Sequence, residues 1–181
     1  KLEKLINREI EFAQDGKPAR IDIKLNNVAD LAMVAKVVEA AKAGVKVRML
    51  VRGTCSLYAI SEELKSKIEI ISIVDRFLEH SRILIFNNGG DEIVYLTSAD
   101  WMVRNLNSRV EMACPVYDAE IRNELKDYFN LQFKDNVKAR VVDANQFNQY
   151  KKDQQLPCRS QQEIYNYLKE KIHAAKLRPA T

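Results

Sequence analysis

The sequence has little of what marks several classes of protein. Its 181 residues include only five glycines and four prolines, too few for a disordered or low-complexity chain. No apolar run approaches the roughly 20 residues that a membrane-spanning helix needs, and no signal peptide is visible. These shortages predict one folded domain, with or without appendages.

Cysteine is also scarce. The three cysteines, Cys55, Cys114 and Cys158, are odd in number, widely spaced and form no C-x-x-C pair. They therefore predict neither a disulfide framework nor a zinc site. Free thiols suit a reducing compartment, so we expect a cytoplasmic location, with peripheral attachment at the inner face of the membrane left open for a full-length protein.

The residues that are present support a packed core and an anionic ligand. Hydrophobic residues make up 46% and charged residues 30% of the chain, with a net charge of +4 and a pI near 8.9. This mildly basic balance lacks the dense basic clusters of a dedicated nucleic-acid binder, so no nucleic-acid partner is expected. Because the chain opens at Lys1 inside a helical pattern, we expect it to be a piece of a longer protein.

Hydrophobic periodicity predicts a β-α-β unit over residues 20–51. Apolar residues alternate with polar ones at 21–25 and again at 45–51, the spacing of half-buried strands. Between them, Asp30 can cap a helix that runs to about Ala43, and Gly44 can end it. A crossover of this length joins parallel strands.

The rest of the chain predicts a mixed sheet. We expect strands at 68–73, 83–86, 93–97 and 109–114, and helices at 2–15, 118–133 and 161–175. The turn residues at 87–91 predict an antiparallel hairpin, and the polar stretch 143–160 predicts an exposed loop. The expected fold class is α/β: a mixed β-sheet flanked by helices over residues 1–143, with an appended loop and C-terminal helical tail over 144–181.

Several residues with phosphate chemistry fall near predicted strand ends. His80 precedes the strand at 83–86, Arg52 follows the strand at 45–51, and Arg109 lies further along the chain. Guanidinium groups bind phosphate oxygens bidentately, and imidazole moves protons near neutral pH. Residue types alone also fit a simpler interpretation, in which His80 is a loop residue and the arginines form surface ion pairs.

A short motif around His80 resembles the phospholipase D signature. The pattern His80-x-Arg82-x4-Asn87, followed by Ser98-x-Asp100, is similar to a degenerate copy of H-x-K-x4-D with its downstream G-S-x-N. Arginine stands in place of the lysine and asparagine in place of the aspartate. These departures argue against ordinary phosphodiester hydrolysis.

A fuller resemblance is to type 1 polyphosphate kinases. The blocks at 21–27, 51–57, 72–82 and 98–106 all resemble that family, and the similarity spans roughly residues 1–143. The resemblance implies a phospholipase D-like fold and the last domain of the enzyme, one of its two phospholipase D-like halves.

The resemblance also implies an activity and partners. The family reversibly transfers the terminal phosphate of ATP to polyphosphate through a phosphohistidine in the preceding half, which is absent here, and needs Mg²⁺, held mainly by that missing part. We therefore expect ATP or ADP, polyphosphate and the upstream domains as partners, a homo-oligomer at full length, and an inactive fragment. No metal ligand is expected in this chain.

The same resemblance assigns roles to individual residues. It implies a catalytic role for His80, phosphate binding of ATP by Arg52, and a place near the phosphate path for Arg109. Glu79 or Asp100 could orient the His80 ring. Further phosphate contacts are expected from the following strand-end residues: Lys24, Asn26 and Ser98.

Some assignments stay open. Arg76 and Arg82 fit a phosphate contact or an ion pair with Glu79 or Asp75 equally well, whereas Trp101 fits core packing better than nucleotide stacking. Two other functions also remain: a single-motif phospholipase D-like phosphodiesterase or nuclease acting as a homodimer, and a non-catalytic polyanion-binding module.

Overall fold

The computed structural model describes residues 1–58 and 61–176. These residues form a mixed seven-stranded sheet in the order β6-β5-β4-β1-β2-β3-β7. Strands β1, β2 and β3 are parallel to one another, and the remaining neighbours pair antiparallel. The strands are β1 (Arg20–Leu25), β2 (Lys46–Val51), β3 (Ile68–Ile73), β4 (Ile83–Phe86), β5 (Ile93–Thr97), β6 (Ala113–Pro115) and β7 (Ala139–Val141).

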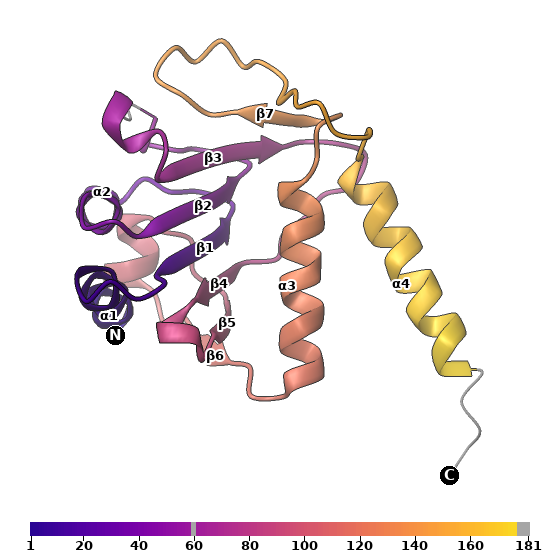
Figure 1. Cartoon of the computed structure of the whole chain (residues 1–181), viewed down its shortest axis with the longest axis horizontal. Helices are drawn as coiled ribbons and strands as arrows, with labels where there is room; N and C mark the ends of the chain where they lie inside the picture. The colour runs from indigo at the N-terminus through magenta and orange to yellow at the C-terminus, as the bar shows by residue number, and fades with distance from the viewer. Residues whose placement is uncertain (59–60, 177–181) are drawn as a thin grey trace.

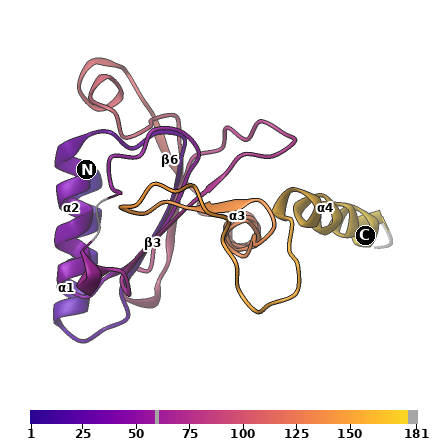
Figure 2. The same ribbon diagram turned by 90° about the horizontal axis from the view of Figure 1, so that it is seen from above.

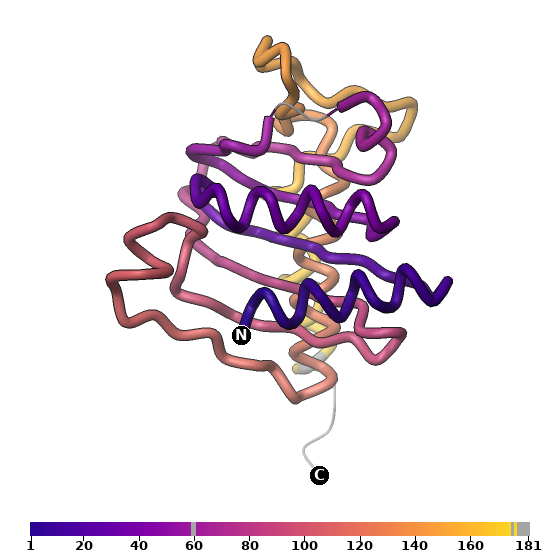
Figure 3. The backbone as a smooth tube through the Cα atoms, turned by 90° about the vertical axis from the view of Figure 1, so that its left-hand side faces the viewer, coloured from indigo at the N-terminus to yellow at the C-terminus, as the bar shows by residue number. Residues whose placement is uncertain are grey.

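Helices cover both faces of the sheet. Helices α1 (Leu2–Gln14) and α2 (Leu31–Lys42) lie side by side across one face, as Figure 3 shows. Helix α3 (Ala119–Phe133) covers the other face, and α4 (Ser160–Lys176) lies beyond it (Figures 1 and 2). Among the helices of the described residues, none has both the length and the apolar character required to cross a bilayer. The expected α/β fold, a mixed sheet flanked by helices, is confirmed.

Local side-chain chemistry sets the helix ends as the sequence predicts. The Asp30 carboxylate accepts a hydrogen bond from the Met33 amide at 3.0 Å, which begins α2. Gly44 follows α2 with φ +102°, a conformation that favours glycine. The Asp118 carboxylate caps α3 in the same way, accepting from the Ile121 amide at 2.9 Å.

The two faces of the sheet carry different side chains. Along β1, Ile21, Ile23 and Leu25 join the larger apolar core, shared with α1 and α2. Asp22 and Lys24 alternate with them and are directed toward α3. The smaller core, between the sheet and α3, comprises Leu50, Ile71, Ile83, Ile85, Val94, Phe129, Phe133 and Ala139.

The strand expected at 109–114 is wrong over most of its length. Residues Arg104–Ser108 form a π-helical turn, and only Ala113–Pro115 pair with β5, as strand β6. Val110 is fully exposed. The reason is geometric, because β5 ends at Thr97 and only the Ser98 amide, which donates to the Met112 carbonyl at 3.0 Å, extends the pairing toward the preceding residues.

The short edge strand β7 was not predicted. Its preceding turn is organised by Asp135, whose buried carboxylate accepts from the amides of Val137, Lys138 and Ala139 at 2.9, 2.6 and 3.0 Å. The other carboxylate oxygen accepts from the amide and hydroxyl of Ser160 at 2.8 and 2.7 Å. One buried aspartate therefore joins the start of β7 to the start of α4.

Candidate functional site

The candidate residues lie along one edge of the sheet. Asn26 and Arg52 directly follow β1 and β2, and Asp100 follows β5, which runs in the same direction as β1. His80 precedes β4, which runs the opposite way, so it reaches the same edge. In open α/β sheets, ligands bind outside the carboxyl ends of the parallel strands.

Asp100 is the centre of this edge. Its Oδ1 accepts from the Asn26 amide at 2.8 Å and from Arg82 Nε at 2.9 Å, and its Oδ2 accepts from Asn27 Nδ2 at 3.0 Å. Burial acts to raise the pKa of this carboxyl, but the hydrogen bonds from Arg82, Asn27 and Asn26 outweigh it and lower the pKa. Asp100 is therefore a buried carboxylate held ionised by its donors.

Arg82 connects Asp100 to His80. Its Nη2 lies 3.2 Å from His80 Nε2. A guanidinium only donates hydrogen bonds, so Nε2 is the acceptor and a neutral ring carries its proton on Nδ1. The ion-pair partner of Arg82 is Asp100, rather than the Glu79 or Asp75 considered from the sequence, and the ring contact comes from Arg82 rather than from Glu79 or Asp100.

Arg52 joins the same network from the other side. Its Nε donates to Asn26 Oδ1 at 2.6 Å, and the Asn27 Oδ1 accepts from the Thr54 amide at 3.0 Å. A Cβ at Gly53 would lie 2.6 Å from Asn27 Oδ1, so only glycine allows this close approach. A continuous path of hydrogen bonds thus runs from Arg52 to His80.

The Lys24 side chain is buried beneath the carboxyl edge of the sheet, whereas a residue that contacts phosphate would be exposed there. Its ammonium is buried and pairs with Glu79 Oε2 at 3.1 Å. Burial lowers the pKa of Lys24 and the nearby Arg52 adds to this, whereas Glu79 opposes both. Glu79 also accepts from Tyr128, Gln132 and Gln161. Lys24 thus contributes positive potential behind the edge and anchors Glu79.

Ser98 and Arg109 lie at the rim. The Ser98 hydroxyl donates to Glu111 and accepts from the Met112 amide, which closes the loop between β5 and β6. Hydrogen bonds from Ser98 and Asn105 lower the pKa of Glu111, and the charges of Arg109 and Arg82 add to this. Arg109 is exposed, and its positive charge acts on the Glu111 carboxylate.

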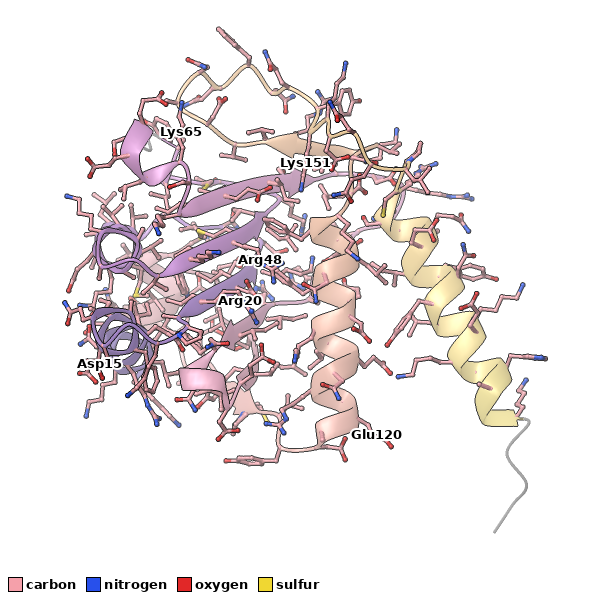
Figure 4. The ribbon with its side chains drawn as sticks, in the orientation of Figure 1. Asp15, Arg20, Arg48, Lys65, Glu120 and Lys151 are labelled. Carbon is pink, nitrogen blue, oxygen red and sulfur yellow. The ribbon has the colours of Figure 1, made fainter. Side chains whose placement is uncertain are left out.

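Other charged side chains between the sheet and α3 are held in ion pairs with one another. Arg48 forms a bidentate pair with Asp22, with both contacts at 2.7 Å, and lies over the rings of Phe129 and Phe133 at 5.1 Å. Arg20 bonds the same carboxylate at 3.0 Å, and Figure 4 shows both arginines between the sheet and α3. These pairs support the fold.

The site does not suit a divalent cation by itself. The carboxylates near His80 and Arg52 are those of Asp100 and Glu79, and the oxygens of both are occupied by donors. Within the described residues, no three histidine, cysteine, aspartate or glutamate side chains gather in a metal-binding arrangement. The geometry fits anionic oxygens instead.

Trp101 connects the site to the core. Its side chain is buried, as the sequence predicts, and its carbonyl accepts from the amides of Ala29 and Asp30 at 2.7 and 2.9 Å. Its own amide donates to the Asn27 carbonyl at 3.1 Å. The residue after Asp100 thereby fixes the turn that leads from β1 into α2.

Comparison with known proteins identifies the family. The family described as polyphosphate kinase C-terminal domain 2 matches residues 1–162. The chain belongs to this polyphosphate kinase family. Its resemblance to type 1 polyphosphate kinases is therefore confirmed.

Individual polyphosphate kinases agree with this assignment. The polyphosphate kinase of Vibrio vulnificus strain YJ016 is 47% identical over 169 residues, which cover 93% of this chain and 24% of that protein. The crystal structure of polyphosphate kinase from Porphyromonas gingivalis aligns with a TM-score of 0.91 at 41% identity, covering 94% of this chain and 26% of that one. The chain spans about a quarter of the length of the relatives it matches.

The phospholipase D-like fold of this polyphosphate kinase domain is confirmed as well. Nuc from Salmonella typhimurium, a phospholipase D family member, aligns with a TM-score of 0.52 at 12% identity, covering 75% of this chain and 89% of that one. At this identity the likeness shows the fold alone.

Four residues of the candidate site were not found from the sequence. Asn27 lies two residues after the end of a predicted strand, and this position was a usable signal. The remaining three carry neutral side chains on helices, a pattern typical of any solvated helix face: Tyr128, Gln132 and Gln161.

Proposed function

We propose that this chain is the C-terminal catalytic segment of a polyphosphate kinase that reversibly transfers the terminal phosphate of ATP to polyphosphate. The single observation that carries the proposal is the hydrogen-bonded path from Arg52 through Asn26, Asp100 and Arg82 to His80. It draws an imidazole and two guanidinium groups, distant along the chain, to one edge of the sheet in a family of polyphosphate kinases.

Arg52 is suited to hold phosphate oxygens. Its Nε is engaged by Asn26, which fixes the plane of the guanidinium. Among the described residues, no hydrogen-bond partner occupies its two terminal nitrogens, so they are available for a bidentate contact. Phosphoryl transfer depends mainly on positioning and on stabilising charge at the phosphate oxygens. In this proposal Arg52 supplies both, with Lys24 behind it and Arg109 at the rim.

His80 is suited to move or share a proton. Because Nε2 faces the Arg82 guanidinium, the proton of the neutral ring is on Nδ1, where it can be donated to the oxygen that leaves or attacks the phosphate. Arg82 is itself paired with Asp100, so its charge is largely offset and the ring is held in one tautomer. Asn26 and Ser98 are proposed as further polar contacts near the phosphates.

The remaining parts of the reaction belong to a longer protein in this proposal. The phosphorylated histidine and the ligands of Mg²⁺ would lie in an upstream domain, and Mg²⁺ would offset phosphate charge there. The fragment alone would then show no turnover, and the enzyme would work as a cytoplasmic homo-oligomer. Residues 1–143 would form the catalytic half-domain and residues 144–181 its appended tail.

The test is a pair of histidine substitutions in the full-length enzyme. His80→Ala should lower polyphosphate synthesis by at least about 10²-fold, because general acid–base groups contribute about 10²- to 10⁴-fold. His173→Ala, in the exposed last turns of α4, is the matched control and should leave synthesis unchanged. Near-normal synthesis by the His80 variant would end the proposed role.

A third substitution tests the binding part of the proposal. Arg52→Ala should raise the KM for ATP more than it lowers kcat, because the interaction with the phosphates exists before transfer begins. A lowered kcat with an unchanged KM would instead place Arg52 in the transition state only. Hydrolysis of a bis-nitrophenyl phosphate ester by the chain, lost in His80→Ala, would favour the phosphodiesterase alternative.

A further inference from the structure

The segment that carries His80 lies outside the sheet. Residues 74–82 leave β3 on the side of α3 and α4 and return to β4, as Figures 1 and 2 show. Phe77 is 60% and Leu78 80% exposed, so these apolar side chains do not anchor the segment. Its conformation must therefore be set by polar contacts.

Gln161, in the first turn of α4, supplies several of these contacts. Its Oε1 accepts from the Phe77 amide at 2.9 Å and its Nε2 donates to the Phe77 carbonyl at 2.8 Å, which imitates a neighbouring strand. The same Nε2 donates to Glu79 Oε1 at 3.1 Å. One buried side-chain amide thus fixes the backbone three residues before His80 and the side chain immediately before it.

Two other contacts reinforce this arrangement. The other oxygen of Glu79 accepts from Lys24 and Tyr128 at 3.1 and 3.0 Å, so the carboxylate is held from β1, α3 and α4 together. Arg159, just before α4, forms a bidentate pair with Asp75 at 2.8 and 2.7 Å. The segment 74–82 is held at its start, middle and end.

The start of α4 is itself rigidly anchored. Ser160 is fully buried and donates both its amide and its hydroxyl to Asp135. Beyond the first turn, α4 is mostly exposed, and Tyr165 and Ile172 face solvent. Residues 159–161 are therefore held more firmly than the rest of α4. The side chains of Arg159 and Gln161 contact the segment that carries His80.

We propose that Gln161, supported by Arg159 and Ser160, is a positioning residue for His80 and acts through Phe77 and Glu79. The inference rests on the proposed function, because it gives a role to the segment that follows β7 in the same phosphate transfer. Displacement of a catalytic group by about 1 Å can cost about 10²-fold in rate.

The experiment compares two adjacent glutamines in the full-length enzyme. Gln161→Ala removes the contacts to Phe77 and Glu79, whereas Gln162→Ala, an exposed neighbour that bonds only Asn166 among the described residues, is the matched control. Gln161→Ala should lower kcat by about 10- to 100-fold and leave the KM for ATP within about twofold, because Arg52 is not displaced. Amide hydrogen exchange over residues 74–82 should accelerate in this variant only.

The outcomes separate this inference from the proposed function. If His80→Ala abolishes synthesis but the two glutamine variants match in kcat and in hydrogen exchange, positioning by Gln161 is overturned and the proposed function stands. If His80→Ala stays active, both are overturned. Should Gln161→Ala fail to fold, Gln161→Glu provides the second variant. It keeps the acceptor for the Phe77 amide, loses the donor to both the Phe77 carbonyl and Glu79, and should show the same selective loss of kcat.

Discussion

The two faces of the sheet differ in what they bury. Against α1 and α2, β1 presents Ile21, Ile23 and Leu25 to a continuous apolar core. Against α3, the alternating positions bury charges: Asp22 near the middle of the strand and Lys24 toward its carboxyl end. One strand therefore contributes to both stability and chemistry, because its side chains alternate between the two faces.

On the charged face, the groups in the middle of the strands differ from those at the carboxyl ends of the strands. In the middle of the sheet, Asp22 is shared by Arg20 and Arg48, and Arg20 also pairs with Glu92, so these charges are held in ion pairs. At the carboxyl edge, Lys24, Arg52 and Arg82 outnumber the carboxylates of Glu79 and Asp100. We therefore expect the apolar face to supply most of the free energy of unfolding. The charged face should instead determine how that free energy changes with pH.

The largest effect is expected on the apolar face. Ile23→Ala should lower the free energy of unfolding by about 3–4 kcal/mol, because a fully buried isoleucine loses its contacts and leaves a cavity. Urea denaturation of the chain measures this. A loss below about 1 kcal/mol would contradict the view that this face supplies most of the stability.

A somewhat smaller effect is expected at the centre of the site. Asp100→Asn should lower the free energy of unfolding by about 3 kcal/mol at neutral pH, because it leaves the Arg82 charge without its partner. The folded-state pKa of Asp100 is lowered, so its contribution is present above the ordinary carboxyl pKa and is lost as pH falls through the lower folded value. The difference between wild type and variant should therefore shrink below about pH 4, as thermal unfolding at several pH values would show. A pH-independent difference would contradict this account.

A smaller effect is expected at Lys24, which is next to Ile23 but on the opposite face. Lys24→Met should lower the free energy of unfolding by only about 1 kcal/mol, because the variant no longer buries an ammonium charge and Glu79 keeps three other hydrogen-bond donors. The folded-state pKa of Lys24 is lowered, so wild-type stability gains as pH rises from that value toward the ordinary lysine pKa. The variant should lack this gain at pH values just below the ordinary lysine pKa of about 10.4. Equal slopes for the two proteins in this range would refute the prediction.

The smallest effect is expected where α4 meets α3 at the surface. Lys171 pairs with Glu124, and both side chains are largely in solvent. Lys171→Ala should leave the free energy of unfolding almost unchanged, since exposed ion pairs contribute little and are screened by salt. A loss comparable to that of Asp100→Asn, measured by urea denaturation, would show that the distal helix is coupled to the site.

Alternating hydrophobicity and capping residues were enough to predict most of the fold from the sequence. The β-α-β unit, the hairpin around Asn87–Asp91 and the cap at Asp118 are all present. The three-residue strand β7 has no periodicity to detect. Residues 109–112 of the expected strand instead lead from the π-helical turn at Arg104–Ser108 to β6. The helical tail was predicted, but its contact with the His80 segment was not, because Gln161 lies 84 residues from Phe77.

The site was only partly predictable. The sequence indicated that His80, Arg52 and Arg109 would converge. Hydrogen bonds link His80 and Arg52 at one edge through Asn26, whereas among the described residues none joins Arg109 to them. The pairing of Arg82 with Asp100 depends on two strands meeting in space, whereas sequence proximity favoured Glu79 or Asp75. The division after residue 143 stays a prediction, as do the phosphate roles of all the candidate residues: His80, Arg52, Arg109, Lys24, Asn26 and Ser98.

The position of Trp101 gives the molecule a built-in optical probe. It is the chain's single tryptophan, it is buried, and its backbone joins Asp100 to the turn before α2. Its indole emission should therefore shift to longer wavelength when water enters around this turn. Loosening of the carboxyl edge could be followed by fluorescence without any attached dye, alongside global unfolding by circular dichroism.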